Sequence, residues 1–351
     1  MVVSKASSEN GRVRFVDAVN GREEVVTDLN AELGAESLIG PFIASGAATY
    51  QDVPLEFDFT LDRLVRDGAT SLTLALVLPQ AKASGEFFGA LSRHADLQTL
   101  RGRLQAKGES LAALIHGLPL AEKPRGLPRA LAQPFSLTAE ITGSESEAAA
   151  DALALNLVPL SLDGRVAARF DEVPDFTVDL ATKSVDLDKL LAKPAAAGGE
   201  AAQGDSSQSA APPAAPAATE SAAPLPLELP RGVAASVTLA ADALLYRGQT
   251  LRQLRLAARL AEGEVQLEQA EAQLPGSSDV ALSGKLSSAP AGSRFDGTIA
   301  ANSDNLRSLL QWLGVEIPAV PADRLRRMAL KTGIEARQDQ VTLRNIDLQL
   351  D

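Results

Sequence analysis

Apolar and polar side chains alternate along most of this chain, and this spacing of two constrains the fold more than any other feature. In LEFDFTLD, residues 55–62, Leu55, Phe57 and Phe59 are separated by acidic residues. Successive side chains of an extended strand point to opposite faces, so the pattern predicts strands with one apolar face. The same alternation occurs at 72–78, 135–141, 153–157, 166–170, 176–180 and 237–241. The chain is therefore expected to be mainly β, with roughly sixteen to twenty strands and three or four short helices.

Composition and pattern conflict most strongly in LRQLRLAARLAEGEVQLEQAEAQL, residues 251–274. Its Ala, Leu, Arg, Glu and Gln residues have high intrinsic helix propensity. Leu256 and Leu260, however, join the other apolar residues only in an extended chain, because a helical spacing leaves them on the wrong side. The alternation predicts a β-hairpin that turns at Gly263, where glycine tolerates positive φ, and a bulge near Gln269.

An internal repeat accompanies the alternation. FTVDLATKSVDLDKLL, residues 176–191, aligns without a gap with FDGTIAANSDNLRSLL, residues 295–310, and more loosely with LRGRLQAKGESLAALI, residues 100–115. Each copy predicts a strand, a turn and a short helix whose leucines face inward. Such repeats favour stacked, similar units over one closed domain. A second repeated spacing places a glycine eleven residues before a phenylalanine, at Gly46 and Phe57 and again at Gly284 and Phe295.

An apolar face spread over so many strands must be covered or must bind something, since exposed apolar area costs about 25 cal/mol per Å². With few helices expected, the solutions are a second sheet, as in a sandwich, or a curled sheet with an apolar interior. Aromatic residues make up only 4% of the chain, and a lining of Leu, Ala and Val suits flexible hydrocarbon chains. We expect a long, curved, largely antiparallel sheet that forms an open apolar groove, with a packed sandwich core as the alternative.

One segment differs from the rest in composition. Pro, Ala, Gly and Ser dominate residues 194–228, and large apolar side chains there are too few to offset the entropy of ordering. This segment is predicted to be a disordered linker. It separates two regions, 1–193 and 229–351, and both are expected to contribute strands to the groove.

Charge and residue content disfavour several function classes. The net charge of -12 and the sequence pI near 4.8 argue against nucleic-acid binding, which requires Lys and Arg to displace counterions. The chain has no cysteine, so thiolate metal sites and disulfides are excluded. His94 and His116 are the only histidines and have no nucleophile motif beside them, so surface or packing roles are expected. The sequence predicts a protein that is not an enzyme, with no catalytic residue, no metal ligand and no cofactor.

A few other residues have a structural and a functional interpretation. Asp186 and Asp188 are expected in the first turn of a helix, which the helix dipole favours, rather than to act as general acid and base. Trp312 is expected to cap the core with its short helix, and contact with lipid at a groove end is the alternative. The basic cluster Arg324, Arg326 and Arg327 is expected to lie on a solvated strand edge, and binding to anionic head groups is the alternative.

Several phrases of the sequence resemble the AsmA family of bacterial envelope proteins. They are GRVRFVDAVNGREEVVTDLNAEL, SLIGPFIASGAATYQDVPLEFDFTL, FTVDLATKSVDLDKLL, LPGSSDVALSGKL and RSLLQWLG, and they span nearly the whole chain. The resemblance implies a long β-groove that carries lipid between the inner and outer membranes, held in the inner membrane by an N-terminal helix and crossing the periplasm. No run of about 18 apolar residues occurs here, so we expect a fragment that lacks this anchor; the alternative is that the membrane assignment does not carry over.

The resemblance also implies the partners: phospholipid or another acylated lipid, a membrane contacted through the missing anchor, and envelope proteins whose identity stays open. One alternative is a structural or assembly factor for outer-membrane protein or lipopolysaccharide biogenesis that conducts no lipid. A secreted β-rich enzyme or adhesin is disfavoured because no catalytic set is present. The residues expected to line the groove are Leu55, Phe57, Phe59, Leu72, Leu74, Leu76, Phe135, Leu137, Phe176, Val178, Leu180, Val237, Leu239, Leu254, Leu256, Leu260, Val265, Leu267 and Phe295.

Overall fold

The computed structural model describes residues 3–17, 22–94, 97–118, 129–158, 160–191, 229–289, 292–315, 325–337 and 340–351. These residues form one sheet of 18 strands. The strands are β1 (Val3–Asp17), β2 (Arg22–Ala35), β3 (Phe42–Tyr50), β4 (Val53–Leu61), β5 (Ala69–Leu78), β6 (Ala83–His94), β7 (Leu97–Gly108), β8 (Phe135–Gly143), β9 (Glu147–Leu157), β10 (Leu160–Arg169), β11 (Asp175–Asp186), β12 (Ala234–Tyr246), β13 (Gln249–Ala261), β14 (Glu264–Leu274), β15 (Ser278–Ala289), β16 (Gly292–Ser303), β17 (Met328–Arg337) and β18 (Val341–Leu350).

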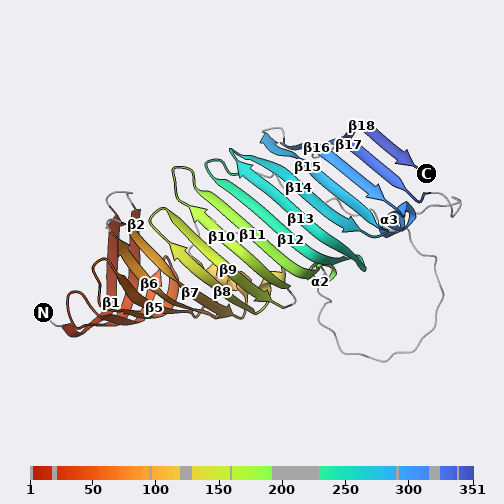
Figure 1. Ribbon diagram of the computed structural model, residues 1–351. Helices are drawn as coiled ribbons and strands as arrows, with labels where there is room; N and C mark the ends of the chain where they lie inside the picture. Colours follow the sequence, from red (N-terminus) through yellow and green to blue (C-terminus); the bar gives the residue numbers. More distant parts are fainter. Residues whose placement is uncertain are drawn as a thin grey trace, which may run out of the picture.

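Each strand pairs with the next strand along the chain, and the sheet is long and curved. Every neighbouring pair is antiparallel except β11 and β12, which run parallel. The strands follow one another from the N-terminal to the C-terminal end of the molecule (Figure 1). Among the described residues β1 and β18 do not pair with each other, so the sheet does not close into a barrel. The predicted long, curved, largely antiparallel sheet is confirmed.

The segment 251–274 is a hairpin, as its alternation predicts. Strands β13 and β14 pair in antiparallel register and turn at Glu262 and Gly263, whose φ angles are 53° and 75°. The register shifts next to Gln269, where the phase of the apolar residues slips, and this is the predicted bulge. Cross-strand packing of one apolar face therefore outweighs the helix propensity of the individual residues.

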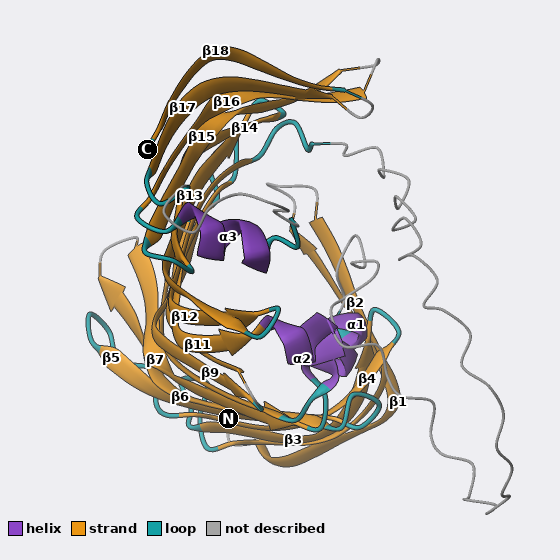
Figure 2. Ribbon diagram, turned by 90° about the vertical axis from the view of Figure 1, so that its right-hand side faces the viewer, coloured by secondary structure: helices purple, strands orange, loops and turns teal. Residues whose placement is uncertain are grey.

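The three repeat copies each give a strand followed by a short helix. Helix α1 (Leu111–Gly117) follows β7, α2 (Leu187–Leu191) follows β11, and α3 (Leu306–Trp312) follows β16. A 3-10 turn, η1 (Arg129–Ala132), precedes β8. All three helices lie on the concave side of the sheet (Figure 2). In α3 the predicted inward leucines Leu306 and Leu309 are both buried.

Each helix begins at a polar residue that accepts a hydrogen bond from the first turn. Ser110 Oγ accepts from the Ala113 N–H at 3.1 Å, and Asn305 Oδ1 accepts from the Ser308 N–H at 3.1 Å. Asp186 Oδ1 accepts from the Lys189 N–H at 2.9 Å. Side chains of this kind satisfy amide groups that have no partner inside the helix, and so they fix where each helix starts.

Strand direction divides the sheet into two edges with different contents. We call one edge the helix rim, because all three helices leave the sheet there; its tight connections are 51–52, 79–82, 247–248 and 275–277. We call the opposite edge the open rim; its connections include 36–41, 62–68, 144–146, 170–174, 229–233 and 262–263. Strand β12 runs parallel to β11, so it also begins at the open rim and ends at the helix rim.

The predicted linker, residues 194–228, lies outside the described residues. The strands on either side of it, β11 and β12, are hydrogen-bonded to each other from Asp175 and Ala234 onward. The two predicted regions, 1–193 and 229–351, therefore contribute to one continuous sheet.

The repeated glycine and phenylalanine spacing does not place the two residues in the same arrangement in both copies. Gly46 lies directly opposite Phe57 on the neighbouring strand. Gly284 lies opposite Gly297 instead, and Phe295 lies opposite Leu286. A Cβ atom added to Gly284 would be 2.7 Å from Phe295 Cζ, and one added to Gly297 would be 2.8 Å from the same atom. The ring of Phe295 therefore lies over this glycine pair.

Candidate functional site

The predicted lining residues all share one face of the sheet. Residues opposite each other on neighbouring strands point to the same side, so register decides which side chains lie together. Phe57 is opposite Leu76, Val178 is opposite Val237, and Leu239 is opposite Leu256. The same ladder links the remaining candidates from β4 to β16. We call this side of the sheet the apolar face.

The apolar face is the side on which the helices lie. A buried cluster of Ala81, Ala83, Phe135 and Leu157 packs against Leu111 and Leu114 of α1. Trp312 of α3 lies edge-on to Tyr246 of β12, with 6.3 Å between ring centroids, and its Nε1–H donates to the Tyr246 carbonyl at 3.3 Å. Trp312 thus holds its helix against the sheet, which is the capping role predicted for it.

Most of the candidate lining side chains are only half-buried. Phe176 keeps 36% of its surface exposed and Leu239 keeps 38%, although both lie on the apolar face. In a sandwich, a second layer would bury such residues. The described part of the chain forms only one sheet, and short helices cover parts of it. The packed-sandwich alternative is therefore wrong for the residues that the structure describes.

Phe135 differs from the other candidates because it is fully packed. Only 5% of its surface is exposed, since α1 covers the start of β8. Leu137, two residues further along the same strand, is half-buried at the edge of the same cluster. Phe135 belongs to the core beneath α1 and does not line the open part of the apolar face. Alternation alone could not show this, because the covering helix comes from a different segment.

The apolar face also includes residues that were not among the candidates. On the last strand, Val341 is opposite Ala336, which is itself opposite Phe295. Asn345 has a φ of 53°, and the strand changes phase there, so the later apolar residues return to the same face. This irregular spacing is the signal that strict alternation missed. The added residues, all about half exposed or more, are Val341, Leu343, Ile346, Leu348 and Leu350.

The opposite side of the sheet is charged and polar. Ion pairs join neighbouring strands there: Arg165 with Asp151 at 2.9 Å and Arg169 with Asp175 at 2.6 Å. Exposed pairs of this kind contribute about 0–1 kcal/mol each to stability. Their main consequence is that this side, which we call the outer face, presents charged and polar groups to water.

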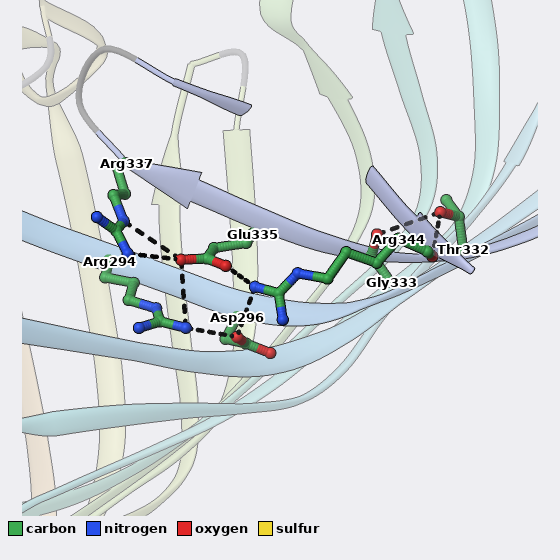
Figure 3. A network of polar contacts seen from close by, with 7 residues as sticks. All are labelled: Arg294, Asp296, Thr332, Gly333, Glu335, Arg337 and Arg344. Carbon is green, nitrogen blue, oxygen red and sulfur yellow. Dashed lines mark hydrogen bonds and ion pairs between the residues drawn. The ribbon is translucent and has the colours of Figure 1, made fainter. Parts of the chain in front are cut away.

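The largest group of outer-face charges joins β16, β17 and β18 (Figure 3). Two carboxylates, Asp296 and Glu335, lie directly opposite each other on neighbouring strands, an arrangement that is unfavourable without cations. Arg294 bridges them, at 3.1 Å from Asp296 and 3.2 Å from Glu335. Arg337 and Arg344 also pair with Glu335. The arginines thus compensate the acidic pair and hold the last strands in register.

Asp186 and Asp188 have structural partners. The backbone N–H and ammonium group of Lys189 hydrogen-bond to Asp186 and hold the pKa of its carboxyl below the usual range. The carboxylate of Asp188 accepts hydrogen bonds from the N–H groups of Arg247 and Gly248, at 2.7 and 2.9 Å. Asp186 is a helix cap, as expected for the first turn. Asp188 also fastens α2 to the β12–β13 turn, which the sequence did not predict.

The remaining candidate polar residues lie near chain turns and helix ends. His116 is exposed at the end of α1, where its Nδ1 lies 2.8 Å from the Ala112 carbonyl oxygen. The N–H groups of Arg326 and Arg327 both donate to Asp351 Oδ1, and both residues are exposed just before β17. Arg324 lies outside the described residues, and His94 is the last residue of β6.

A hollow of about 360 Å³ lies beside β7 to β11. Arg101, Thr142 and Ala149 contribute to it and are opposite one another on β7, β8 and β9. Arg165, one of its lining residues, forms the outer-face pair described above, so the hollow is polar and lies away from the apolar face.

The described ranges contain neither a candidate metal cluster nor a candidate membrane-spanning helix. No group of three or more His, Cys, Asp or Glu residues there is placed to hold a metal ion. None of the helices there is both long and apolar enough to cross a membrane.

These features define an open β-groove: one curved sheet with a solvated outer face and an apolar face that the short helices cover only in part. Backbone amides and carbonyls are paired in the ladders between strands, so the floor of the groove offers mainly apolar contact. It can bind by burial of apolar surface rather than by directional bonds. The chain matched no family model, no curated protein and no solved structure.

Proposed function

We propose that this protein carries phospholipid or another acylated lipid along its apolar face and catalyses no covalent reaction. The observation that carries the proposal is the half-exposed state of that face. Side chains such as Phe176 and Leu239 lie in register on one continuous apolar surface, yet no second layer covers them in the described part of the chain. Exposed apolar surfaces of this extent mark sites of interaction with apolar partners.

The energetics favour movement along such a face. Burial of one methylene group is worth about 0.8 kcal/mol, so transfer of a sixteen-carbon chain into water costs about 12 kcal/mol. A lipid that slides along a continuous apolar surface avoids most of this barrier, because each methylene leaves one contact only as it makes the next. The head group remains in water throughout.

The resemblance to the AsmA family supports a cellular setting for this activity. In that setting the protein is periplasmic and tethered to the inner membrane, and lipid passes toward or from the outer membrane. The acidic composition fits a groove that stays dissolved while its interior is apolar.

The test is recovery of lipid with the purified protein. The chain is purified from bacterial cells without detergent, extracted with organic solvent, and the phospholipid is measured by mass spectrometry per mole of protein. Leu239→Asp places a carboxylate on the open part of the apolar face, and lipid recovery should fall at least severalfold because a charge there must be desolvated. Thr238→Asp, one residue away on the outer face, is the matched control and should leave recovery unchanged.

Circular dichroism separates loss of binding from loss of fold. Strand content should be the same in the wild type and both variants, and Phe176→Asp provides a second position if Leu239→Asp unfolds. A wild-type protein that carries no lipid would contradict the proposal and would favour the alternative of an assembly factor without lipid conduction.

A further inference from the structure

Burial on the apolar face changes along the length of each strand. On β12, Leu239 is 38% exposed, whereas Ala241 and Leu244, closer to the helix rim, are 6% and 9% exposed. On β11, Phe176 is 36% exposed near the open rim, and Thr182 is 9% exposed toward the helix rim. The groove is therefore asymmetric across its width.

The same asymmetry is present on neighbouring strands. Three described residues of the sheet depart from this asymmetry. Thr70 is buried near the open rim, and Ala139 and Thr332 are buried near strand centres. The other buried residues of β8, β9 and β13 to β16 lie toward the helix rim: Phe135, Leu157, Leu251, Ala272, Ser278 and Ser303.

The helices cause this asymmetry, because each is fastened to turns of the helix rim. Glu109, just before α1, forms an ion pair with Lys82 at 2.7 Å. Asp188 of α2 binds the 247–248 turn through two N–H groups. At α3, a Cβ atom added to Gly276 would be 2.7 Å from the Asn305 carbonyl oxygen, so the start of this helix lies against the 275–277 turn. The three helices thus cover the half of the face next to the helix rim.

We propose that the acyl chains of a bound lipid occupy the other half of the apolar face, next to the open rim, from β8 to β16. We call this strip the open lane. This inference rests on the proposed function and adds to it the position of the lipid: the tails lie in the open lane, and the head group projects past the open rim into water.

The dimensions of the open lane fit an acyl chain. On β12 it runs from Ala234 to Ala240, about seven residues or about 23 Å at 3.3 Å per residue. The hydrocarbon core of a bilayer is about 30 Å thick, so the tails of one leaflet span about 15 Å. A tail laid along the strands is thus accommodated between the open rim and the helices.

The chemistry of the open lane favours a lipid over a helix from another protein. The resident helices are each held by polar contacts to a rim turn, such as those of Asp188. The inward side chains of the lane, for example Val178, Val237 and Leu256, offer no hydrogen-bonding group. Acyl chains need no such group, whereas an amphipathic helix would find no equivalent anchor on this surface.

Site-specific photocrosslinking tests the position of the lipid. A benzophenone amino acid replaces one residue at a time in the full chain: Leu239 in the open lane, Leu313 beside the helix rim, and Thr238 on the outer face. After irradiation of protein purified from cells, intact-protein mass spectrometry measures the fraction that carries a lipid adduct. Total lipid is measured separately by solvent extraction of the same preparations.

The adduct should form at Leu239 and be at least severalfold weaker at Leu313 and Thr238. If the adduct yield followed side-chain exposure alone, it would be higher at Leu313 than at Leu239, because Leu313 is 48% exposed and Leu239 is 38% exposed. If lipid is recovered but its adduct is equal or stronger at Leu313, the open lane is wrong while the proposed function stands. If no lipid is recovered from any preparation, the proposed function fails and the open lane fails with it. A polypeptide adduct at Leu239 in place of lipid would also overturn the open lane.

Discussion

At the scale of single residues, the floor of the apolar face depends on glycines that leave room for aromatic rings. Phe295 covers Gly284 and Gly297, and a Cβ atom on either glycine would meet the ring at less than 3 Å. Phe87 is placed in the same way, since a Cβ atom on Gly89 would lie 2.6 Å from its Cζ. A ring that lies over a glycine pair covers backbone that carries no side chain of its own. The surface is therefore apolar at that point.

Gly284→Ala should lower the free energy of unfolding by about 1–3 kcal/mol, which is typical of overpacking. The added methyl group would lie 2.5 Å from the Asp296 carbonyl oxygen as well as against the Phe295 ring, so both must shift. Gly333→Ala on β17 is the matched control, because its Cβ atom would have no neighbour closer than 3.5 Å. It should change stability by no more than about 0.5 kcal/mol. Urea unfolding monitored by circular dichroism measures both, and equal effects would contradict this explanation.

At the scale of elements, alternation was sufficient to predict the strands. Residues 251–274 have the composition of a helix, yet they form β13 and β14 with the predicted turn and bulge. The pattern succeeds because a strand with one buried face must place its apolar residues two apart, whatever their intrinsic propensities. The strand, turn and helix repeat was predicted for a similar reason, since polar caps and leucine spacing are local signals.

Features that depend on distant segments could not be predicted. Alternation does not distinguish parallel from antiparallel neighbours, so the pairing of β11 with β12 was not expected. The burial of Phe135 depends on where α1 packs, and the role of Asp188 depends on the position of the 247–248 turn. The candidate lining set was therefore right about the shared face, but it could not show which half of that face is covered.

The cap of α2 makes the stability of this helix depend on pH. The pKa of Asp186 is lowered in the folded protein, first by the Lys189 N–H, so folding favours its ionised form. Its contribution is present above the ordinary aspartate pKa of about 3.9 and is lost as pH falls through the lower folded value. Asp186→Asn keeps an oxygen acceptor for the Lys189 N–H but removes the ionisation.

The wild type should therefore lose its advantage over Asp186→Asn as the pH falls from 7 to below about 4. The measurement is the free energy of unfolding in urea at a series of pH values for both proteins. Asp242→Asn, at an exposed position on β12, is the control for removal of a surface carboxylate. The explanation is wrong if both variants show the same dependence on pH.

At the scale of the whole molecule, the continuous sheet joins regions that composition separates. The predicted division into 1–193 and 229–351 follows the composition of the chain. In the structure the two regions are joined by the parallel ladder of β11 and β12, which pairs Asp175–Asp186 with Ala234–Leu245. The apolar face crosses this junction without interruption, because Val178 lies opposite Val237 and Leu180 opposite Leu239. A lipid path along the groove requires this continuity more than it requires the peptide link between the two regions.

Limited proteolysis tests both the predicted linker and the strength of this junction. Elastase, which cleaves after small residues such as alanine, should cut first within 194–228, because Ala is abundant there and the composition predicts disorder. The two fragments should then co-elute in native gel filtration and separate only in denaturant, since the β11–β12 ladder and the contact of Asp188 with the 247–248 turn still join them. Val237→Pro removes a backbone donor within β12, at the residue that pairs with Val178 of β11, so the fragments of this variant should separate after cleavage. Wild-type fragments that separate without denaturant would show that the junction does not hold the groove together, and a first cut outside 194–228 would contradict the predicted linker.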